Sequence, residues 1–454
     1  MFVGFDYGSS NCAMGVMSEG NVQLVPLEQG KHYLPSTLYT HHSALVVDFV
    51  AKHLHGTAHE HDFLTQRQAL LNTLPRIKSD LDLQPSDETL FIGREAISEY
   101  VQFPEEGYFV KSPKSFFGAT GLKQGQINFF EDIATAMILK IKQRAELSLG
   151  KTLTQTVIGR PVNFQAVGGE QSNQQAVGIL DRAAKRAGFK DVEFLYEPLA
   201  AGIDYESDLT QDQKVLVIDI GGGTSDCSFV QMGPSFRGNS QRDGDFLSHS
   251  GKRVGGNDLD IALSFHGLMP LLGLGSTFKS GLPLPNQAFW QACKINDVNL
   301  QSQFYSESHT RELNAQLRDV SAPELYKRLI HLQQNKQGHQ LVQQGEAAKI
   351  ALSSASAFDC DLSFLDSGLN KNVSVSDLAV AVESSISQIV TLAKQAISDA
   401  ATTPDIIYLT GGSAQSPLIK AALSEHLGDI KMVNGDHFGS VTAGLTKWAS
   451  MLYK

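Results

Sequence analysis

The chain has 454 residues, of which 42% are hydrophobic and 19% are charged, and its formal net charge is −11. This length and composition are typical of a globular protein with a sizeable core, built from two large units or about three compact ones. The acidic balance argues against nucleic acid or an anionic membrane surface as the main partner, because both require concentrated Lys and Arg.

The N-terminus begins directly in a strand-like run, without the basic head and apolar stretch of a secretory signal. No uninterrupted apolar run reaches the roughly 20 residues needed to cross a bilayer. We therefore expect a cytoplasmic protein. The four cysteines are far apart and form no CxxC pair, which favours free buried thiols over disulfides or a zinc site. They are Cys12, Cys227, Cys293 and Cys360.

The first predicted element is a strand–turn–strand hairpin, FVGFDYGSSNCAMGVM, and a similar phrase, VLVIDIGGGTSDCSFVQM, begins at Val215. Asp6 and Asp219 hold equivalent places in the two copies. Glycine and small hydroxyl residues let backbone N–H groups approach a ligand, which is how many proteins hold phosphate oxygens. Either turn alone is most simply an ordinary hairpin, but the repetition favours a pair of phosphate-binding loops.

Residues 41–110 and 263–340 fit the strand–helix alternation less well and are interpreted as insertions or small subdomains. The first of them contains four histidines close together. A solvated helix or loop is favoured over a metal site there, because no closed ligand set is evident. These residues are His53, His55, His59 and His61.

Between the two hairpins, the pattern predicts a strand over Thr156–Val162 and an amphipathic helix over Gln174–Ala187, ended by Gly188. Glu197 follows an apolar run and precedes Pro198 and a helix of small residues. A carboxylate at such a strand end usually faces a cleft.

In the last part of the chain, apolar spacing predicts a long amphipathic helix over Asp377–Ala401. A strand, a Gly-Gly-Ser turn at 411–413 and a second helix follow, with Ser416 as a good N-cap and Pro417 at the first helical position. A glycine turn between strand and helix is a place where a nucleotide can lie against the backbone.

Together and in this order, these motifs resemble the actin-like ATPase superfamily, and most closely the ATPase domain of the DnaK-type chaperones of the seventy-kilodalton heat-shock class. The resemblance spans nearly the whole chain. It implies an α/β, ribonuclease H-like fold with two lobes around a nucleotide cleft. The implied first lobe is 1–210 plus 430–454, with an insertion at about 41–110, and the second is 211–429, with an insertion at about 261–345.

The resemblance also implies ATP or ADP with Mg²⁺ as cofactors, bound at five motifs. The first phosphate motif carries serines where that family has threonines, and the helix over Gly345–Ala355 matches its adenosine-contacting helix. The implied nucleotide-binding residues are Gly8, Ser9, Ser10 and Asn11; Gly221, Gly222, Gly223 and Thr224; Gly255 and Gly256; Glu346, Lys349 and Ser353; and Gly411, Gly412 and Ser413.

For catalysis, the resemblance implies roles for Lys114, Glu197, Asp219 and Asp226, with Lys111 as a competing alignment for Lys114. Lys114 would touch the terminal phosphate, and the three acids are candidates for orienting the attacking water or accepting its proton. Asp6 and Asp219 would organise Mg²⁺ largely through water. An ordinary helix surface stays open for Lys349 and Ser353.

Several departures from the family pattern matter. Ile350 stands where that family has an arginine whose plane covers the adenine, and Gln415 replaces another arginine after the Gly-Gly-Ser turn. The stretch 260–346 is longer than its counterpart. The chain ends soon after the last predicted helix, at Lys454, so we expect the ATPase unit without a C-terminal peptide-binding domain. The expected partners are nucleotide and an unidentified protein, without nucleic acid or membrane.

Three functions stay open at this point. One is a slow, ATP-hydrolysing, chaperone-related protein that acts as a nucleotide-dependent switch. Another is a small-molecule kinase of the same superfamily, against which the Glu-Pro-x-Ala-Ala match at 197–201 argues. The third is a nucleotide-binding scaffold or filament subunit with low turnover. The intact phosphate motifs favour the first.

Overall fold

The computed structural model describes residues 1–103, 107–165, 168–239, 242–435 and 439–453. A first sheet has the strand order β3-β2-β1-β8-β9, with β4 paired to β2. We call the part of the molecule around it the first lobe. Its strands are β1 (Phe2–Tyr7), β2 (Asn11–Ser18), β3 (Asn21–Leu24), β4 (Leu34–Pro35), β8 (Gln155–Arg160) and β9 (Asp191–Tyr196).

A second sheet, the centre of the second lobe, repeats this topology in the order β12-β11-β10-β15-β16. In each sheet an antiparallel three-stranded meander comes first, and two parallel strands follow on its inner edge. The two predicted hairpins, β1–β2 and β10–β11, hold the same place in both sheets. The strands are β10 (Gln213–Ile220), β11 (Ser225–Met232), β12 (Phe246–Lys252), β15 (Ile406–Thr410) and β16 (Lys431–Asn434).

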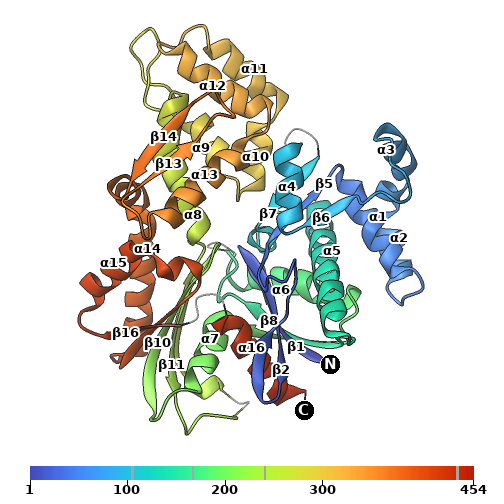
Figure 1. Cartoon of the computed structure of the whole chain (residues 1–454), viewed down its shortest axis with the longest axis vertical. Helices are drawn as coiled ribbons and strands as arrows, with labels where there is room; N and C mark the ends of the chain where they lie inside the picture. Colours follow the sequence, from blue (N-terminus) through green and yellow to red (C-terminus); the bar gives the residue numbers. More distant parts are fainter. Residues whose placement is uncertain (104–106, 166–167, 240–241, 436–438, 454) are drawn as a thin grey trace.

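Helices α7 (Glu197–Glu206) and α16 (Ser440–Leu452) lie between the two sheets (Figure 1). Their small residues permit this close crossing, because a Cβ added at Gly444 would lie 1.7 Å from the carbonyl oxygen of Ala200. Apolar residues of both helices and both sheets form one buried cluster. The cluster fixes the lobes against each other at the base of the molecule.

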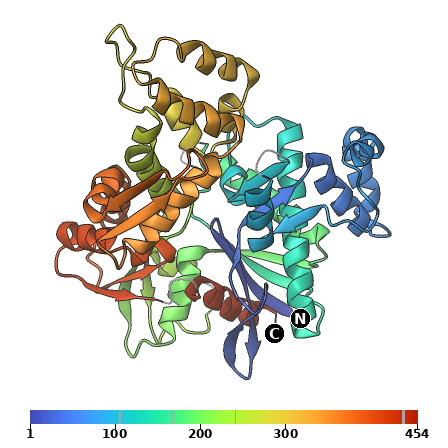
Figure 2. The same cartoon turned by 45° about the horizontal axis from the view of Figure 1, so that its top comes forward.

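The first lobe also holds helices α5 (Gln124–Leu149) and α6 (Gly169–Arg186), which pack against each other beside its sheet. Its insertion forms a small three-stranded sheet with four helices, and Figure 2 shows α1–α3 projecting away from the second lobe. These elements are α1 (Ser43–Leu54), α2 (Glu60–Leu71), α3 (Leu74–Asp80), α4 (Arg94–Gln102), β5 (Thr37–Thr40), β6 (Leu90–Ile92), β7 (Tyr108–Lys111) and the 3₁₀ turn η1 (Pro113–Phe116).

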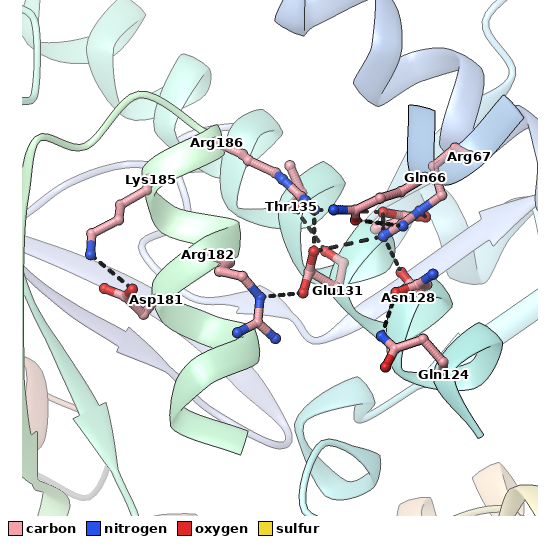
Figure 3. A network of polar contacts seen from close by, with 11 residues as sticks. Gln66, Arg67, Gln124, Asn128, Glu131, Thr135, Asp181, Arg182, Lys185 and Arg186 are labelled. Carbon is pink, nitrogen blue, oxygen red and sulfur yellow. Dashed lines mark hydrogen bonds and ion pairs between the residues drawn. The ribbon is translucent and has the colours of Figure 1, made fainter. Parts of the chain in front are cut away.

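A buried ion network holds α2 against α5 and α6 (Figure 3). Arg67, with a side chain only 1% exposed, donates two hydrogen bonds to Asp132, at 2.7 and 3.0 Å. The neighbouring Glu131 accepts from Arg182 and Arg186 of α6. Burial raises the pKa of Asp132 to about 6, against the lowering effect of Arg67. The network joins three helices that are far apart in the sequence.

The second lobe carries its own insertion of helices above the sheet, followed by a hairpin, one long helix and one shorter helix (Figures 1 and 2). Its elements are α8 (Gly256–Leu263), a π-helical turn (Ser264–Leu268), a 3₁₀ turn (Met269–Leu272), α9 (Gln287–Cys293), α10 (Val298–Phe304), α11 (Glu307–Gln316), α12 (Pro323–Gln334), α13 (Gly338–Ala351), β13 (Ala357–Asp361), β14 (Asn370–Ser374), α14 (Val375–Ala400) and α15 (Pro417–Leu427). Two further 3₁₀ turns are η2 (Asp243–Asp245) and η5 (Gly412–Gln415).

The predicted strand and helices of the chain's middle and end are present with shifted ends. Helix α6 begins at Gly169, well before the predicted Gln174, and α14 begins at Val375 rather than Asp377. Strand β8 ends at Arg160 rather than Val162, because Pro161 cannot donate to the sheet. Gly188 follows α6 with a φ of +92°, a conformation suited to glycine at a helix end. Ser416 stands at the N-cap of α15, but its side chain makes no capping hydrogen bond.

One assignment of chain to lobe needs correction. Residues 431–434 form β16, which pairs in parallel with β15 of the second sheet, so they do not belong to the first lobe as predicted from 430 onward. Only α16, after them, packs on the strands of the first lobe. The four cysteines are buried free thiols, as predicted.

Within the described ranges, α14 is the one helix long and apolar enough to span a membrane by length and composition. This is weak evidence, because a core helix of a globular protein passes the same test. Residues Leu378, Ile386 and Ile389 of α14 are buried in the core of the second lobe. The apolar character of α14 therefore has an explanation in packing.

Candidate functional site

A cavity of about 360 Å³ lies between the two lobes, where the turns of the two hairpins face each other. It is also lined by α13 and by the glycine turn after β15. Most predicted site residues meet here. Those that line it are Asp6, Gly8, Ser9, Ser10, Asn11, Glu197, Asp219, Gly221, Gly222, Thr224, Gly256, Glu346, Lys349, Ser353, Gly411, Gly412 and Ser413.

The hairpin turns approach so closely that only glycine fits at their contact. A Cβ added at Gly222 would lie 1.9 Å from Ser10 Oγ, and one at Gly223 would lie 2.8 Å from Ser9 Oγ. The second turn is closed by a hydrogen bond from Gly221 N to the carbonyl of Thr224, at 3.0 Å. The backbone of both turns is thereby exposed to one end of the cavity.

Two aspartates, one at the end of each central strand, line the same part of the cavity. Burial, then the negative charge of Glu197, raises the pKa of Asp6 to about 7, although Lys114 opposes the shift. Burial, then Glu197, Asp226 and Asp6, raises the pKa of Asp219 well above its ordinary value. The carboxylates are therefore crowded by like charge.

This pair fits a hard cation. Within the described part of the chain, neither Asp6 nor Asp219 has a hydrogen-bond or ion-pair partner that would satisfy its oxygens. No group of three or more His, Cys, Asp or Glu able to hold a metal occurs among the described residues. Mg²⁺ suits such a pair, because it keeps several waters and takes the rest of its oxygens from one or two carboxylates and phosphates.

Lys114 and Glu197 are brought together as an ion pair, and Lys114 also donates to the carbonyl of Gly159 at 3.3 Å. The competing lysine, Lys111, instead pairs with Glu346 of α13 at 2.5 Å. Of the two lysines, Lys114 is therefore the one that lies beside Glu197 and the hairpin turns.

Four predicted site residues do not line the main cavity. Lys114 and Gly223 line a smaller chamber beside it. Asp226 is buried and its Oδ1 accepts a hydrogen bond from Val162 N at 2.8 Å, so it joins the two lobes instead of facing the cavity. Gly255 packs beneath the second turn, where an added Cβ would lie 2.7 Å from the carbonyl oxygens of Gly221 and Gly222.

The far end of the cavity is formed by α13 and its surroundings. Lys349 forms an ion pair with Asp260 at 2.7 Å, and Ser353 lies in the turn after the helix. Glu346 has a lowered pKa, because Lys111 and Lys349 outweigh the effect of burial. Ile350, a residue that is 61% exposed, and Gln415 also line the cavity.

Several residues that line the cavity were not predicted to do so. They are Ala13, Tyr33, Leu259, Val441 and Ser416, the last of which was predicted only as an N-cap. Tyr33 precedes β4, whose pairing with β2 places it beside the first hairpin. That pairing is long-range, and no local pattern in the sequence indicates it.

The duplicated sheets, with a cavity enclosed between two glycine-rich hairpins, define an actin-like ATPase fold. The Hsp70 protein family model matches residues 105–268, which include the Lys114, Glu197 and second-hairpin motifs. This match and the curated relatives described next support an Hsp70/DnaK-type family member.

Three curated relatives illustrate the similarity. The chaperone protein dnaK of Cyanidioschyzon merolae (strain NIES-3377 / 10D) is 30% identical over 270 residues, or 57% of this chain and 37% of that protein. That of Emiliania huxleyi is 29% identical over 265 residues, covering 57% and 36%. That of Endomicrobium trichonymphae is 25% identical over 376 residues, covering 76% and 50%. The matched regions thus span half or less of these relatives.

Proposed function

We propose that the protein binds ATP and ADP with Mg²⁺ in the main cavity and hydrolyses ATP slowly, as a chaperone-related conformational switch. One observation carries this proposal: both hairpin turns and both central aspartates converge on a single cavity of about 360 Å³. Phosphates need inward backbone N–H groups, and their cation needs carboxylates beside them.

Different groups of residues would bind the phosphates and the nucleoside. Backbone N–H groups of Gly8–Asn11 and Gly221–Thr224 would hold the phosphates, and the turn at 411–413 with α13 would hold the nucleoside. Asp6 and Asp219 would hold Mg²⁺ largely through water. When bound, the ion would neutralise charge on the phosphate oxygens, which is a main requirement of phosphoryl transfer.

For the hydrolytic step, Glu197 is the group we expect to orient the attacking water, because its carboxylate lines the cavity beside Asp219. Lys114 holds Glu197 in place and brings a positive charge to the phosphate end. Asp226, whose Oδ1 is occupied by Val162 N, is assigned a positioning role between the lobes.

Two contacts between the insertion of the first lobe and the helices of the second lobe support a conformational switch. Lys111 of β7 pairs with Glu346, which lines the cavity, and the side-chain amide of Asn257 donates to Ser112 Oγ at 3.0 Å. Nucleotide that touches Glu346 would alter a contact joining the two lobes. Differential binding to the open and closed forms is what drives such a transition.

We further propose lobe boundaries near 210 and 435, a cytoplasmic location and an unidentified protein partner that reads the closed state. The decisive test is calorimetry with ATP and Mg²⁺ together with an assay of phosphate release. Binding with slow release supports the proposal. Release that occurs only after a sugar or another hydroxyl compound is added would instead indicate a small-molecule kinase.

A further inference from the structure

A small chamber adjoins the phosphate end of the main cavity, and its wall includes Pro161 and Phe164. Its volume is about 10 Å³, enough for about one water molecule. It shares Ser9 and Thr224 with the main cavity, and its own wall includes Lys114, Ser115 and Arg253. The chamber therefore lies beside the place where a terminal phosphate would lie.

Arg253 is the cation in this wall that no role described above explains. Its Nη2 donates to the carbonyl of Asn296 at 2.5 Å, and its Nε is buried without a hydrogen-bond partner. Among the residues described, Arg253 forms no ion pair. A buried charged donor without a partner costs free energy unless a ligand satisfies it.

The charges of the chamber are therefore not balanced. The positive charge of Lys114 is matched by Glu197, whereas that of Arg253 is not matched by any described carboxylate. Hydroxyl groups of Ser9 and Ser115 belong to residues of the same wall and can donate hydrogen bonds, whereas the Thr224 side chain is hydrogen-bonded to Asp226. This set of donors, with one unpaired guanidinium, suits a small oxyanion.

We propose that the chamber is a separate anion subsite that receives inorganic phosphate after ATP hydrolysis, with Arg253 as the residue that binds it. The inference rests on the proposed function, because hydrolysis supplies the phosphate. The chamber in its present form is smaller than phosphate. Entry therefore requires Arg253 to turn away from the carbonyl of Asn296, which frees its planar fork for two parallel hydrogen bonds.

The test is titration of the ADP- and Mg²⁺-loaded full chain with inorganic phosphate, followed by calorimetry. Arg253→Met should weaken phosphate binding about tenfold or more, the effect of removing a charged hydrogen-bond donor. Affinities for ADP and a non-hydrolysable ATP analogue should stay unchanged. Arg253→Lys should retain part of the phosphate affinity. Arg237→Met is the matched control, because among the described residues Arg237 donates to backbone carbonyls of Glu206 and Leu209 and to no carboxylate.

Three results would overturn the subsite: unchanged phosphate affinity in Arg253→Met, an equal loss of analogue affinity, or no phosphate binding by the ADP-loaded wild type. If Arg253→Met does not fold, Arg253→Gln removes the charge while keeping a donor for Asn296, and the same criteria apply to it. Failure of the wild type to bind ADP or the analogue would contradict the proposed function itself, which separates the two failures.

Discussion

Lys114 and Glu197 form an ion pair at the junction between the main cavity and the small chamber. Lys114 comes from the turn η1 and Glu197 is the first residue of α7, and their side chains are 3% and 12% exposed. The pair thus joins two distant segments of the first lobe at the point where the proposed reaction takes place.

Because the pair is nearly buried, removing one partner should destabilise the fold. We expect Lys114→Met to lower the free energy of unfolding by about 3 kcal/mol, since the carboxylate of Glu197 loses its counter-charge. The double variant Lys114→Met/Glu197→Gln should recover most of this loss. Urea unfolding measures both effects, and equal stability of Lys114→Met and wild type would refute the role of the pair.

The crowded aspartates make stability depend on pH. Because the pKa values of Asp6 and Asp226 are raised to about 7, the folded protein keeps protons that the unfolded chain has lost above about pH 4. Their contribution to stability is full below about pH 4 and is lost as the pH rises to about 7. In protein free of nucleotide and Mg²⁺, the free energy of unfolding should fall across this range.

Asp219→Asn isolates part of this effect, because its amide cannot ionise. The gain in stability over wild type should be larger at pH 8 than at pH 4.5, because burial and the neighbouring carboxylates hold the pKa of Asp219 well above its ordinary value. Asp361→Asn is the control. Hydrogen bonds from Ser363 lower the pKa of the exposed Asp361, so this variant should not become more stable relative to wild type as the pH rises. Calorimetric unfolding of Asp219→Asn and Asp361→Asn at the two pH values measures the difference.

The contact between the hairpin turns should tolerate no side chain at Gly222. The methyl group of Gly222→Ala would meet Ser10 Oγ at 1.9 Å, so we expect a loss of about 1–3 kcal/mol in stability and weaker binding of nucleotide analogue. Gly222→Ala/Ser10→Gly should restore much of both. Gly125→Ala, in α5 with open space around it, should cost nothing. Wild-type behaviour of Gly222→Ala would show that the turns do not form this contact.

The network of Figure 3 predicts that Arg67 anchors the first insertion. Arg67→Met leaves Asp132 and Glu131 short of a buried counter-charge, and stability should fall by about 3–5 kcal/mol. Arg182→Met is the control, because Arg182 reaches the same Glu131 from a half-exposed position and should change stability by less than about 1 kcal/mol. Similar losses in the two variants by urea unfolding would contradict the network.

The sequence predicted the repeated hairpins well, because each is a local strand–turn–strand pattern whose small residues are visible in the chain. The small-residue helix after Glu197 and the glycine turn at 411–413 were predictable for the same reason. Lys349 and Ser353 line the cavity because of the way α13 packs in the tertiary structure. The periodicity of the sequence does not predict that packing.

Other features depend on contacts between distant segments. Tyr33 reaches the cavity only because β4 pairs with β2, and Arg67 meets Asp132 only because α2 packs on α5. The resemblance implied Asp226 as a candidate for orienting the attacking water. In the structure, however, its Oδ1 accepts a hydrogen bond from Val162 N of the other lobe. Strand β16 was placed in the wrong lobe, because its four residues carry no sign of which sheet they join.

The most direct measurement of the central proposal is phosphate release with ATP and Mg²⁺, made alongside calorimetry, for wild type, Asp219→Asn and Glu197→Ala. We expect the wild type to bind ATP with Mg²⁺ and to release phosphate slowly. Both variants should keep the fold by circular dichroism but lose about 100-fold or more of the release rate. A wild type that neither binds nor hydrolyses ATP, or variants that hydrolyse it at the wild-type rate, would contradict the proposal.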